Sequence, residues 1–328
     1  MRQFIIKRLL WAVMILFLVA FVIYLLMRAL PTSYVEAIAR ERAAAQTGMS
    51  YKQWLEQLTA IYRLDVHPVI GFFHWVGNAI RGQFGTSWHW GVDVVQKFRD
   101  VIPASIILGA SAFVLEIVIA IPLGILAARK QYSLTDYTVT FMALIGISLP
   151  TFFVATILKM VFAVNLGWLD LYGMVSRDHR RMTDLQKVLD IASHMIMPVL
   201  TIVVISVGSL MRYTRTNMLE VLNADYIRTA RAKGLSERRV INYHAFRNTL
   251  IPIVTIVGGT LPSLFSGALI TEQLFQIPGI GWISYISMTR GDIPFTMFYL
   301  SFMAILTMLG NLISDILYAV VDPRVRVS

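Results

Sequence analysis

Residues 224–240 read ADYIRTARAKGLSERRV, a polar stretch that lies between two apolar parts of the chain. Apolar side chains recur at helical spacing from just before this stretch into its first half, at Leu219, Leu222, Tyr226 and Ala230. Gly234 stands where a C-cap glycine ends a helix. Ser236 then offers an N-cap, with Glu237 in the first turn of a second helix. The stretch therefore predicts a helix, a tight glycine turn and another helix, which together form a compact projection.

Working outward from this projection, the chain contains six apolar runs near the roughly 20 residues that a transmembrane helix needs. They cover approximately residues 9–30, 104–128, 139–164, 194–211, 250–275 and 294–321. We therefore predict an all-α polytopic membrane protein with six transmembrane helices. An extracytoplasmic segment follows the first helix, and a cytoplasmic loop joins the fourth helix to the fifth.

The composition supports a membrane protein and excludes several other classes. Hydrophobic residues make up 57% of the 328 residues and charged residues only 15%, whereas about a quarter of an ordinary soluble protein is charged. There is no cysteine. Disulfide scaffolds, thiolate metal sites and cysteine nucleophiles are therefore excluded.

The net charge of +10 follows the membrane topology. The short connections on one side carry most of the Lys and Arg residues, and eight of these lie in the loop after the fourth run: Arg212, Arg215, Arg228, Arg231, Lys233, Arg238, Arg239 and Arg247. The positive-inside rule places this loop and both termini in the cytoplasm. Binding of anionic membrane lipid is an alternative role for the loop, and no nucleic-acid partner is indicated.

We expect three regions along the chain: an N-terminal transmembrane helix (1–30), an extracytoplasmic segment (31–103) and a five-helix core (104–328) whose loop spans 212–250. The first helix exceeds the length of a signal-peptide core, so we expect a retained anchor. In the second region, residues 34–61 predict an amphipathic helix. The aromatic residues that follow, from Phe72 to Trp90, favour a belt at the membrane interface over a docking site for a partner.

The segment from Tyr226 to Gly234, with the sequence HAFRN at 244–248, resembles the permease subunits of ABC importers in the dipeptide, oligopeptide and nickel branch. These are the inner-membrane components of binding-protein-dependent transport systems. Three further segments are similar to recurrent parts of that family: QIPGIG at 276–281, RGDIP at 290–294 and YAVVDPR at 318–324. The glutamate of the wider family's loop motif is absent, and Arg228 occupies its place.

The resemblance implies that this chain forms half of a pathway with a second homologous permease in a bacterial or archaeal plasma membrane. It also implies two ABC ATPase subunits, which bind ATP and Mg, and an extracytoplasmic substrate-binding protein. The residues it assigns to coupling with the ATPase are Asp225, Tyr226, Arg228, Thr229, Ala230, Arg231, Gly234, Leu235, Glu237 and Arg238.

The chain itself lacks the Gly-Lys-Ser/Thr segment of a P-loop. We therefore expect no cofactor, metal or catalytic residue in this chain, and ATP hydrolysis by partner subunits.

Four residues are candidates for the pathway or its gate. A charge at the bilayer centre costs about 2.5 to 3.5 kcal/mol on insertion scales. Glu116 is the deepest acidic residue, and it either lines the pathway, where it could meet the ammonium group of a peptide, or pairs with a neighbouring helix. Glu272 is either a gate or a cap for the turn at 278–279. Pro150 and Pro262 predict kinks in the third and fifth helices.

Oligopeptides are the favoured cargo, because the external segment is long; dipeptides, nickel chelates and sugars stay open. His194 stands alone in the sequence, whereas a nickel site favours clustered histidines.

The motifs of intramembrane hydrolases are missing from the sequence. A secondary transporter driven by an ion gradient is less favoured, because no inverted repeat or paired acidic groups are evident.

Overall fold

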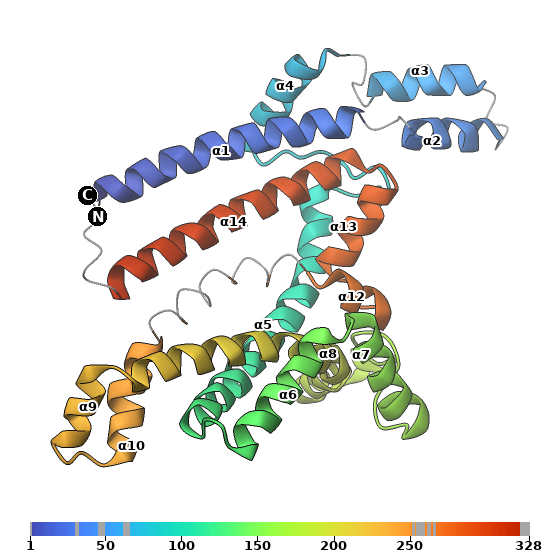
Figure 1. The fold of residues 1–328 in the computed structure, drawn as a ribbon. Helices are drawn as coiled ribbons and strands as arrows, with labels where there is room; N and C mark the ends of the chain where they lie inside the picture. Colours follow the sequence, from blue (N-terminus) through green and yellow to red (C-terminus); the bar gives the residue numbers. More distant parts are fainter. Residues whose placement is uncertain are drawn as a thin grey trace. The chain divides into compact units, whose positions relative to one another are not determined.

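A computed structural model describes residues 2–29, 33–44, 50–61, 66–250, 253, 260, 264 and 267–321. Within these ranges the regular structure is helical (Figure 1), and the one β-bridge joins Thr86 to Asp93. This confirms the predicted all-helical class. The α-helices are α1 (Arg2–Ala29), α2 (Ser33–Ala44), α3 (Tyr51–Ile61), α4 (Pro68–Ile80), α5 (Val94–Arg129), α6 (Leu134–Ser148), α7 (Thr151–Leu158), α8 (Asp184–Leu222), α9 (Asp225–Ala232), α10 (Glu237–Arg239), α12 (Leu269–Phe275), α13 (Ile280–Thr289) and α14 (Ile293–Val321). The π-helical segments are Lys159–Asn165 and Val240–Ala245, and His179–Arg181 form a 3-10 turn.

Several of these helices are long and apolar enough to cross a membrane. Among the described residues they are α5, α8 and the part of α14 from Ile293 to Ile313. A fourth span is formed if α6 and the helical stretch Thr151–Asn165 are taken together. The apolar part of α1, Val13–Ala29, is shorter, and half of the predicted fifth span lies outside the described residues.

The predicted third span is two helices rather than one. Leu149 ends α6 with an extended backbone, Pro150 precedes α7, and the two axes differ by 104°. Proline has no amide hydrogen to donate and restricts the residue before it to extended conformations, so the helix stops at this point. The predicted interruption at Pro150 is confirmed, and the break is far sharper than a kink.

Long helices begin before the apolar runs that predict them. Thr183 and Gln186 form a capping box, so α8 starts ten residues ahead of the predicted position at His194. Asp93 accepts hydrogen bonds from the amides of Val95 and Gln96 and starts α5 in the same way. With 39 residues, α8 is about 58 Å long, nearly twice the roughly 30 Å of a hydrocarbon core.

The chain divides into two compact units. The first consists of residues 1–101 and 283–308, and the second of residues 102–282 and 309–328.

In the first unit, α4 packs on α1 through aromatic side chains. Phe72 is fully buried, and its ring makes edge contacts with the rings of Phe17, Phe21 and Tyr24. The next residue, Phe73, is 59% exposed. The predicted aromatic belt is therefore wrong for Phe72, which packs inside the protein.

The amphipathic helix predicted over 34–61 is a pair of helices, α2 and α3. Ser50 and Gln53 start α3: the Ser50 amide donates to Gln53 Oε1 at 2.9 Å, and the Gln53 amide donates to Ser50 Oγ at 3.4 Å. This S-x-x-Q capping box is visible in the sequence. The predicted apolar face of α3 is confirmed, because Leu58 is buried against Val35 and Ala39 of α2.

A second anchor in the first unit is Asp292, which lies in the turn before α14 and is fully buried. Its carboxylate accepts hydrogen bonds from Ser87 Oγ and from the amides of Trp88, His89 and Phe295. This carboxylate therefore ties the loop before α5 to the start of α14.

We predict that Asp292→Ala lowers the free energy of unfolding by about 3 kcal/mol, because four donors lose their acceptor in a buried place. Thermal unfolding of the purified protein in detergent measures this. Asp93→Ala is the matched control, since it removes an exposed helix cap worth about 1 kcal/mol. Equal losses from the two variants would contradict the role assigned to Asp292.

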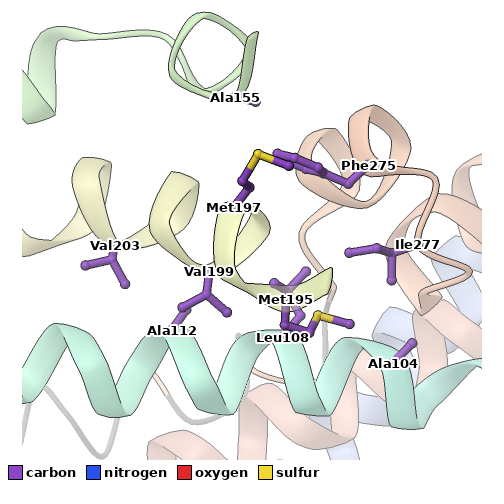
Figure 2. Close-up of a cluster of buried hydrophobic side chains, with 10 residues drawn as sticks. All are labelled: Ala104, Leu108, Ala112, Ala155, Met195, Met197, Val199, Val203, Phe275 and Ile277. Carbon is purple, nitrogen blue, oxygen red and sulfur yellow. The ribbon is translucent and has the colours of Figure 1, made fainter. Parts of the chain in front are cut away.

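The core of the second unit lies between α5, α7, α8 and α12. Figure 2 shows side chains of α5 and α8 meeting across their contact, and the sulfur of Met197 beside the ring of Phe275. Sulfur–aromatic contacts of this kind stabilise irregular packing. The buried members of this core are Ala104, Leu108, Ala112, Ala155, Met195, Met197, Val199, Val203, Phe275 and Ile277.

Backbones approach closely where small residues are placed. A Cβ atom added to Gly146 of α6 would lie 2.3 Å from the carbonyl oxygen of Val204, and one added to Gly208 of α8 would lie 2.4 Å from that of Ala143. On α5, a Cβ added to Gly124 would lie 2.7 Å from the Met211 carbonyl. Small residues permit this approach in membrane helices.

Candidate coupling site and pathway

The predicted projection exists and forms one end of the second unit. We call residues 223–245 the knob. Figure 1 shows α9 and α10 side by side beyond the end of α8. Gly234 has a φ of +75°, which a glycine adopts without strain, and the chain then turns into α10 through Ser236. The predicted order of helix, glycine turn and helix is confirmed.

The knob has an apolar core of its own, joined to the ends of α5 and α8. Ile227 is fully buried, and the cluster also includes Met218 of α8 and Ala128 of α5. The predicted apolar face is wrong at Tyr226, which is 46% exposed, because Ile227 takes the inward position. The remaining buried members are Ala230, Val240, Ile241 and Ala245. Since this core includes the ends of two long helices, the knob is packed on them and does not hang as a free loop.

The outer surface of the knob is charged. Arg231 donates two hydrogen bonds to Glu237 across the glycine turn, at 2.7 and 3.2 Å. The hydrogen bond from Arg231 holds the pKa of the Glu237 carboxyl below its ordinary value, so the pair stays charged at neutral pH and is lost only on acidification. Arg228 pairs with Asp225 at 3.6 Å, as the spacing predicts.

Most of the residues predicted to couple to an ATPase share this surface. Ala230 is buried and Leu235 is half-buried. Burial raises the pKa of the Tyr226 hydroxyl, which also forms a hydrogen bond with the Asn248 side chain. The exposed members of the predicted set are Asp225, Tyr226, Arg228, Thr229, Arg231, Gly234, Glu237 and Arg238.

An ion pair that the sequence did not reveal links the start of α6 to α8. Arg215 donates from Nε and Nη2 to the two carboxylate oxygens of Asp136, each at 2.7 Å, and Asp136 is buried. Such a bidentate pair fixes the geometry as well as the distance. The pair therefore holds α6 to the part of α8 that leads to the knob.

We predict that Asp136→Ala lowers the free energy of unfolding by about 3 kcal/mol, because it leaves Arg215 partly buried and without its carboxylate. Thermal unfolding in detergent is the measurement. The double variant Asp136→Ala/Arg215→Met is expected to be more stable than Asp136→Ala alone. Equal stabilities of the two variants would show that an Arg215 side chain without its carboxylate does not destabilise the protein.

Glu272 of α12 is a structural brace. It is fully buried, and its carboxylate accepts hydrogen bonds from Ser105 Oγ at 2.6 Å, from the Trp282 amide at 2.9 Å and from the Ala268 amide at 3.2 Å. Ser105 Oγ in turn accepts from the Ile280 amide at 2.7 Å. The carboxylate thus holds the QIPGIG turn against α5. Of the two roles left open by the sequence, this geometry favours the cap for the turn.

The predicted fifth helix is not continuous to Phe275. Gly267 has a φ of +78° and Ala268 is not helical, so α12 starts afresh at Leu269. A Cβ on Gly267 would lie 2.4 Å from the amide nitrogen of Gly281. The chain breaks here because the QIPGIG turn packs directly on its backbone. Pro262, the predicted kink, lies outside the described residues.

Glu116 of α5 faces a cavity of about 380 Å³. Polar groups in the wall include the hydroxyls of Ser206 of α8 and of Thr260. Ser105 and Ala268, which bond to Glu272, also line this cavity. The other lining residues are Gly109, Ala112, Phe113, Ile202, Leu264 and Gly267. Glu116 therefore lines the cavity, and Glu272 is hydrogen-bonded to two residues that line it. Pro150 is not one of the lining residues.

His194 does not stand alone, contrary to the sequence prediction. Its Nδ1 lies 2.8 Å from the carbonyl oxygen of Asp190, and His179 Nδ1 lies 2.6 Å from the carboxylate of the same aspartate. Asp190 also accepts hydrogen bonds from the hydroxyl and amide of Ser176. In the part of the chain that the structure describes, no three acidic or histidine side chains are placed to hold a metal ion. The cluster pins the loop before α8 to that helix.

Comparison with known proteins shows the family of the chain. A family model described as the inner membrane component of binding-protein-dependent transport systems matches residues 120–327. The chain is 36% identical to the oligopeptide transport system permease protein AppB of Bacillus subtilis (strain 168), covering 99% of this chain and 100% of that protein. It is 33% identical to a putative peptide transport system permease protein of Brucella abortus (strain 2308) and to the dipeptide transport system permease protein DppB of Escherichia coli (strain K12), covering 99% of each chain. The chain therefore belongs to the family of inner membrane components of binding-protein-dependent transport systems.

Proposed function

We propose that this chain is the permease subunit of an ATP-driven peptide importer and forms half of the pathway through the membrane. The names of its relatives, which include oligopeptide, peptide and dipeptide permeases, support a peptide as cargo. Oligopeptides are the favoured class. The partners we propose are a second homologous permease, two ABC ATPase subunits and an extracytoplasmic substrate-binding protein.

The topology we propose has six spans with both termini in the cytoplasm of a bacterial or archaeal cell. The N-terminal helix (1–30) and the segment 31–103 precede a five-helix core (104–328). The distribution of Lys and Arg supports this orientation. Because the loop 212–250 carries eight of these residues, the knob lies on the cytoplasmic side in this arrangement.

The observation that carries the proposal is the knob on the end of α8. The helix is about 58 Å long, and its residues 212–222 follow the apolar run 194–211 and lead to the knob, so this end extends beyond a 30 Å hydrocarbon core. The apolar cluster around Ile227 joins the knob to α5 and α8, so a displacement of the knob moves both helices. A soluble partner that grips the charged outer surface can therefore transmit its motion to the spans.

This arrangement requires that ATP is hydrolysed elsewhere. The chain has no Gly-Lys-Ser/Thr segment with which backbone amides and a lysine could hold phosphates. ATP and Mg are bound by the partner ATPases in the proposed complex. Their docking surface on this chain is formed by the exposed knob residues, among them Arg228, Arg231 and Glu237.

Reconstitution tests the proposal. The complete complex is placed in liposomes with ATP inside and the binding protein outside, and the uptake of labelled peptides of two to eight residues is followed. We expect uptake that requires ATP, the binding protein and an intact P-loop lysine in the partner ATPase. Uptake that follows an imposed ion gradient without ATP would instead support a secondary transporter.

Dipeptides are the second candidate cargo, because the Escherichia coli relative is named for them. The same assay separates the two classes by length: a maximum at two residues supports dipeptides, and a maximum at four or more supports oligopeptides. Nickel chelates and sugars serve as negative controls for both.

A further inference from the structure

The cavity beside Glu116 is a polar feature of the second unit that the coupling mechanism does not use. Its lining residues belong to α5 and α8 and also include Thr260, Leu264, Gly267 and Ala268. With a volume of about 380 Å³, it has room for a small polar group and its first waters. Its wall combines the hydroxyls of Ser206 and Thr260 with the ring of Phe113 and small or aliphatic side chains.

Glu116 lies deep along the span. It stands thirteen positions before Arg129, the last residue of α5, which places it about 20 Å from that end of the helix. It is also the middle residue of the apolar run 104–128 that predicts this span. Intramembrane carboxylates at such depths face other helices or water-filled cavities, and they mark substrate or ion pathways.

The two deep carboxylates of the second unit differ in what satisfies them. Glu272 is fully buried and accepts three hydrogen bonds, so it has little capacity left for a ligand. Glu116 is partly exposed, and it lines the cavity together with Ser206. No basic side chain among the described residues forms an ion pair with it. A carboxylate without an ion-pair partner keeps acceptor capacity for a ligand.

We propose that Glu116, with Ser206 beside it, is a transient binding site for the ammonium group of the transported substrate. A carboxylate with free lone pairs attracts a cation, and an adjacent hydroxyl can turn its oxygen towards the donor hydrogens of an ammonium. Every unblocked peptide carries an ammonium at its N-terminus. The assignment of this group to a peptide rests on the proposed function, whereas the preference of the cavity for cations does not.

Charge-selective labelling tests the cavity itself. The chain contains no cysteine, so Ser206→Cys places a single thiol next to Glu116. The complete complex in liposomes is treated with cationic and anionic methanethiosulfonate reagents, and modification of this chain is followed by mass spectrometry. For each variant we take the ratio of the reaction rate with the cationic reagent to the rate with the anionic reagent. We expect this ratio to be about ten- to hundredfold higher in Ser206→Cys than in Ser206→Cys/Glu116→Gln. Ser236→Cys, on the exposed turn of the knob, is the control whose ratio stays unchanged when Glu116→Gln is added.

Uptake then tests the ammonium assignment. Glu116→Gln keeps the size of the side chain and removes its charge, whereas Glu116→Asp keeps the charge. We expect ATP-driven uptake of a peptide with a free N-terminus to fall about tenfold in Glu116→Gln and to be largely retained in Glu116→Asp. The amounts of complex in the liposomes are compared on gels to exclude poor assembly.

Each outcome decides a separate point. A labelling ratio that does not depend on Glu116 overturns the cation site. A charge-dependent ratio with unchanged peptide uptake in Glu116→Gln overturns the assignment to the substrate's ammonium group. Absence of ATP-driven peptide uptake by the unmodified complex overturns the proposed function, while the labelling still reports whether the cavity selects cations.

Discussion

Gly234→Pro abolishes ATP-driven uptake while the protein still reaches the membrane. Gly234 has a φ of +75°, whereas the proline ring fixes φ near −65°. The substitution therefore rotates the chain between α9 and α10 and pulls Arg231 away from Glu237. Since the turn is at the outer end of the knob and its neighbourhood is open, the spans fold as before.

The measurement combines uptake, ATPase activity and the amount of ATPase that co-purifies with the permease. Gly234→Asn is the matched control, because asparagine tolerates the left-handed conformation better than other residues with a side chain, and it is expected to keep most of the uptake. Normal uptake by Gly234→Pro at normal membrane abundance would remove the knob from the coupling mechanism.

A charge swap separates the two roles of the pair across this turn. Arg231→Glu and Glu237→Arg each break the pair, and together they restore it in reverse. If the pair only shapes the knob, the double variant recovers uptake; if its charges meet the ATPase, the double variant stays inactive.

Glu272→Ala prevents accumulation of folded protein. The substitution leaves Ser105 Oγ and the amides of Ala268 and Trp282 without their acceptor in a buried place. At about 1 to 3 kcal/mol for each unsatisfied group, the loss is a large part of a typical stability of 5 to 15 kcal/mol. Glu272→Gln, which keeps one acceptor oxygen, is expected to be intermediate.

Size-exclusion chromatography of detergent extracts after heating measures this loss. Glu220→Ala, at an exposed position of α8, is the control and changes stability by less than about 0.5 kcal/mol. Gly279→Ala is expected to resemble Glu272→Ala, because its Cβ would lie 2.2 Å from the Glu272 carboxyl carbon. If the Glu272→Ala protein has normal stability but altered uptake, the result would contradict the structural role and support a gate.

The knob could be predicted from the sequence because its determinants are local. A C-cap glycine and a nearby N-cap residue define two helix ends within three residues of each other. The same local signals were available for the starts of α3 and α8, in the S-x-x-Q of residues 50–53 and the T-x-x-Q of residues 183–186. Hydropathy alone does not show the start of α8, because the apolar side chains of a span end at the edge of the bilayer whereas the helix continues beyond it.

The partners of the buried polar residues could not be predicted. Asp136 and Arg215 are 79 positions apart, and Ser105 and Glu272 are 167 apart. Helical periodicity gives the face on which a residue lies but not the helix that the face meets. Consequently the sequence left Glu272 between two roles, and it gave no indication that His179 and His194 share Asp190.

The reciprocal glycine contacts between α6 and α8 limit how this protein can move. Gly146 faces the backbone of α8, and Gly208 faces the backbone of α6, so sliding either helix along the other by a fraction of a turn brings a carbonyl oxygen against the Cβ of a neighbouring residue. The Asp136–Arg215 pair clamps the same two helices near one end. These contacts hold α6 and α8 together as one rigid pair. Any opening of a passage through the second unit therefore has to come from movements outside this pair. The 104° bend at Pro150, where α6 ends and α7 follows, lies directly beside this pair of helices.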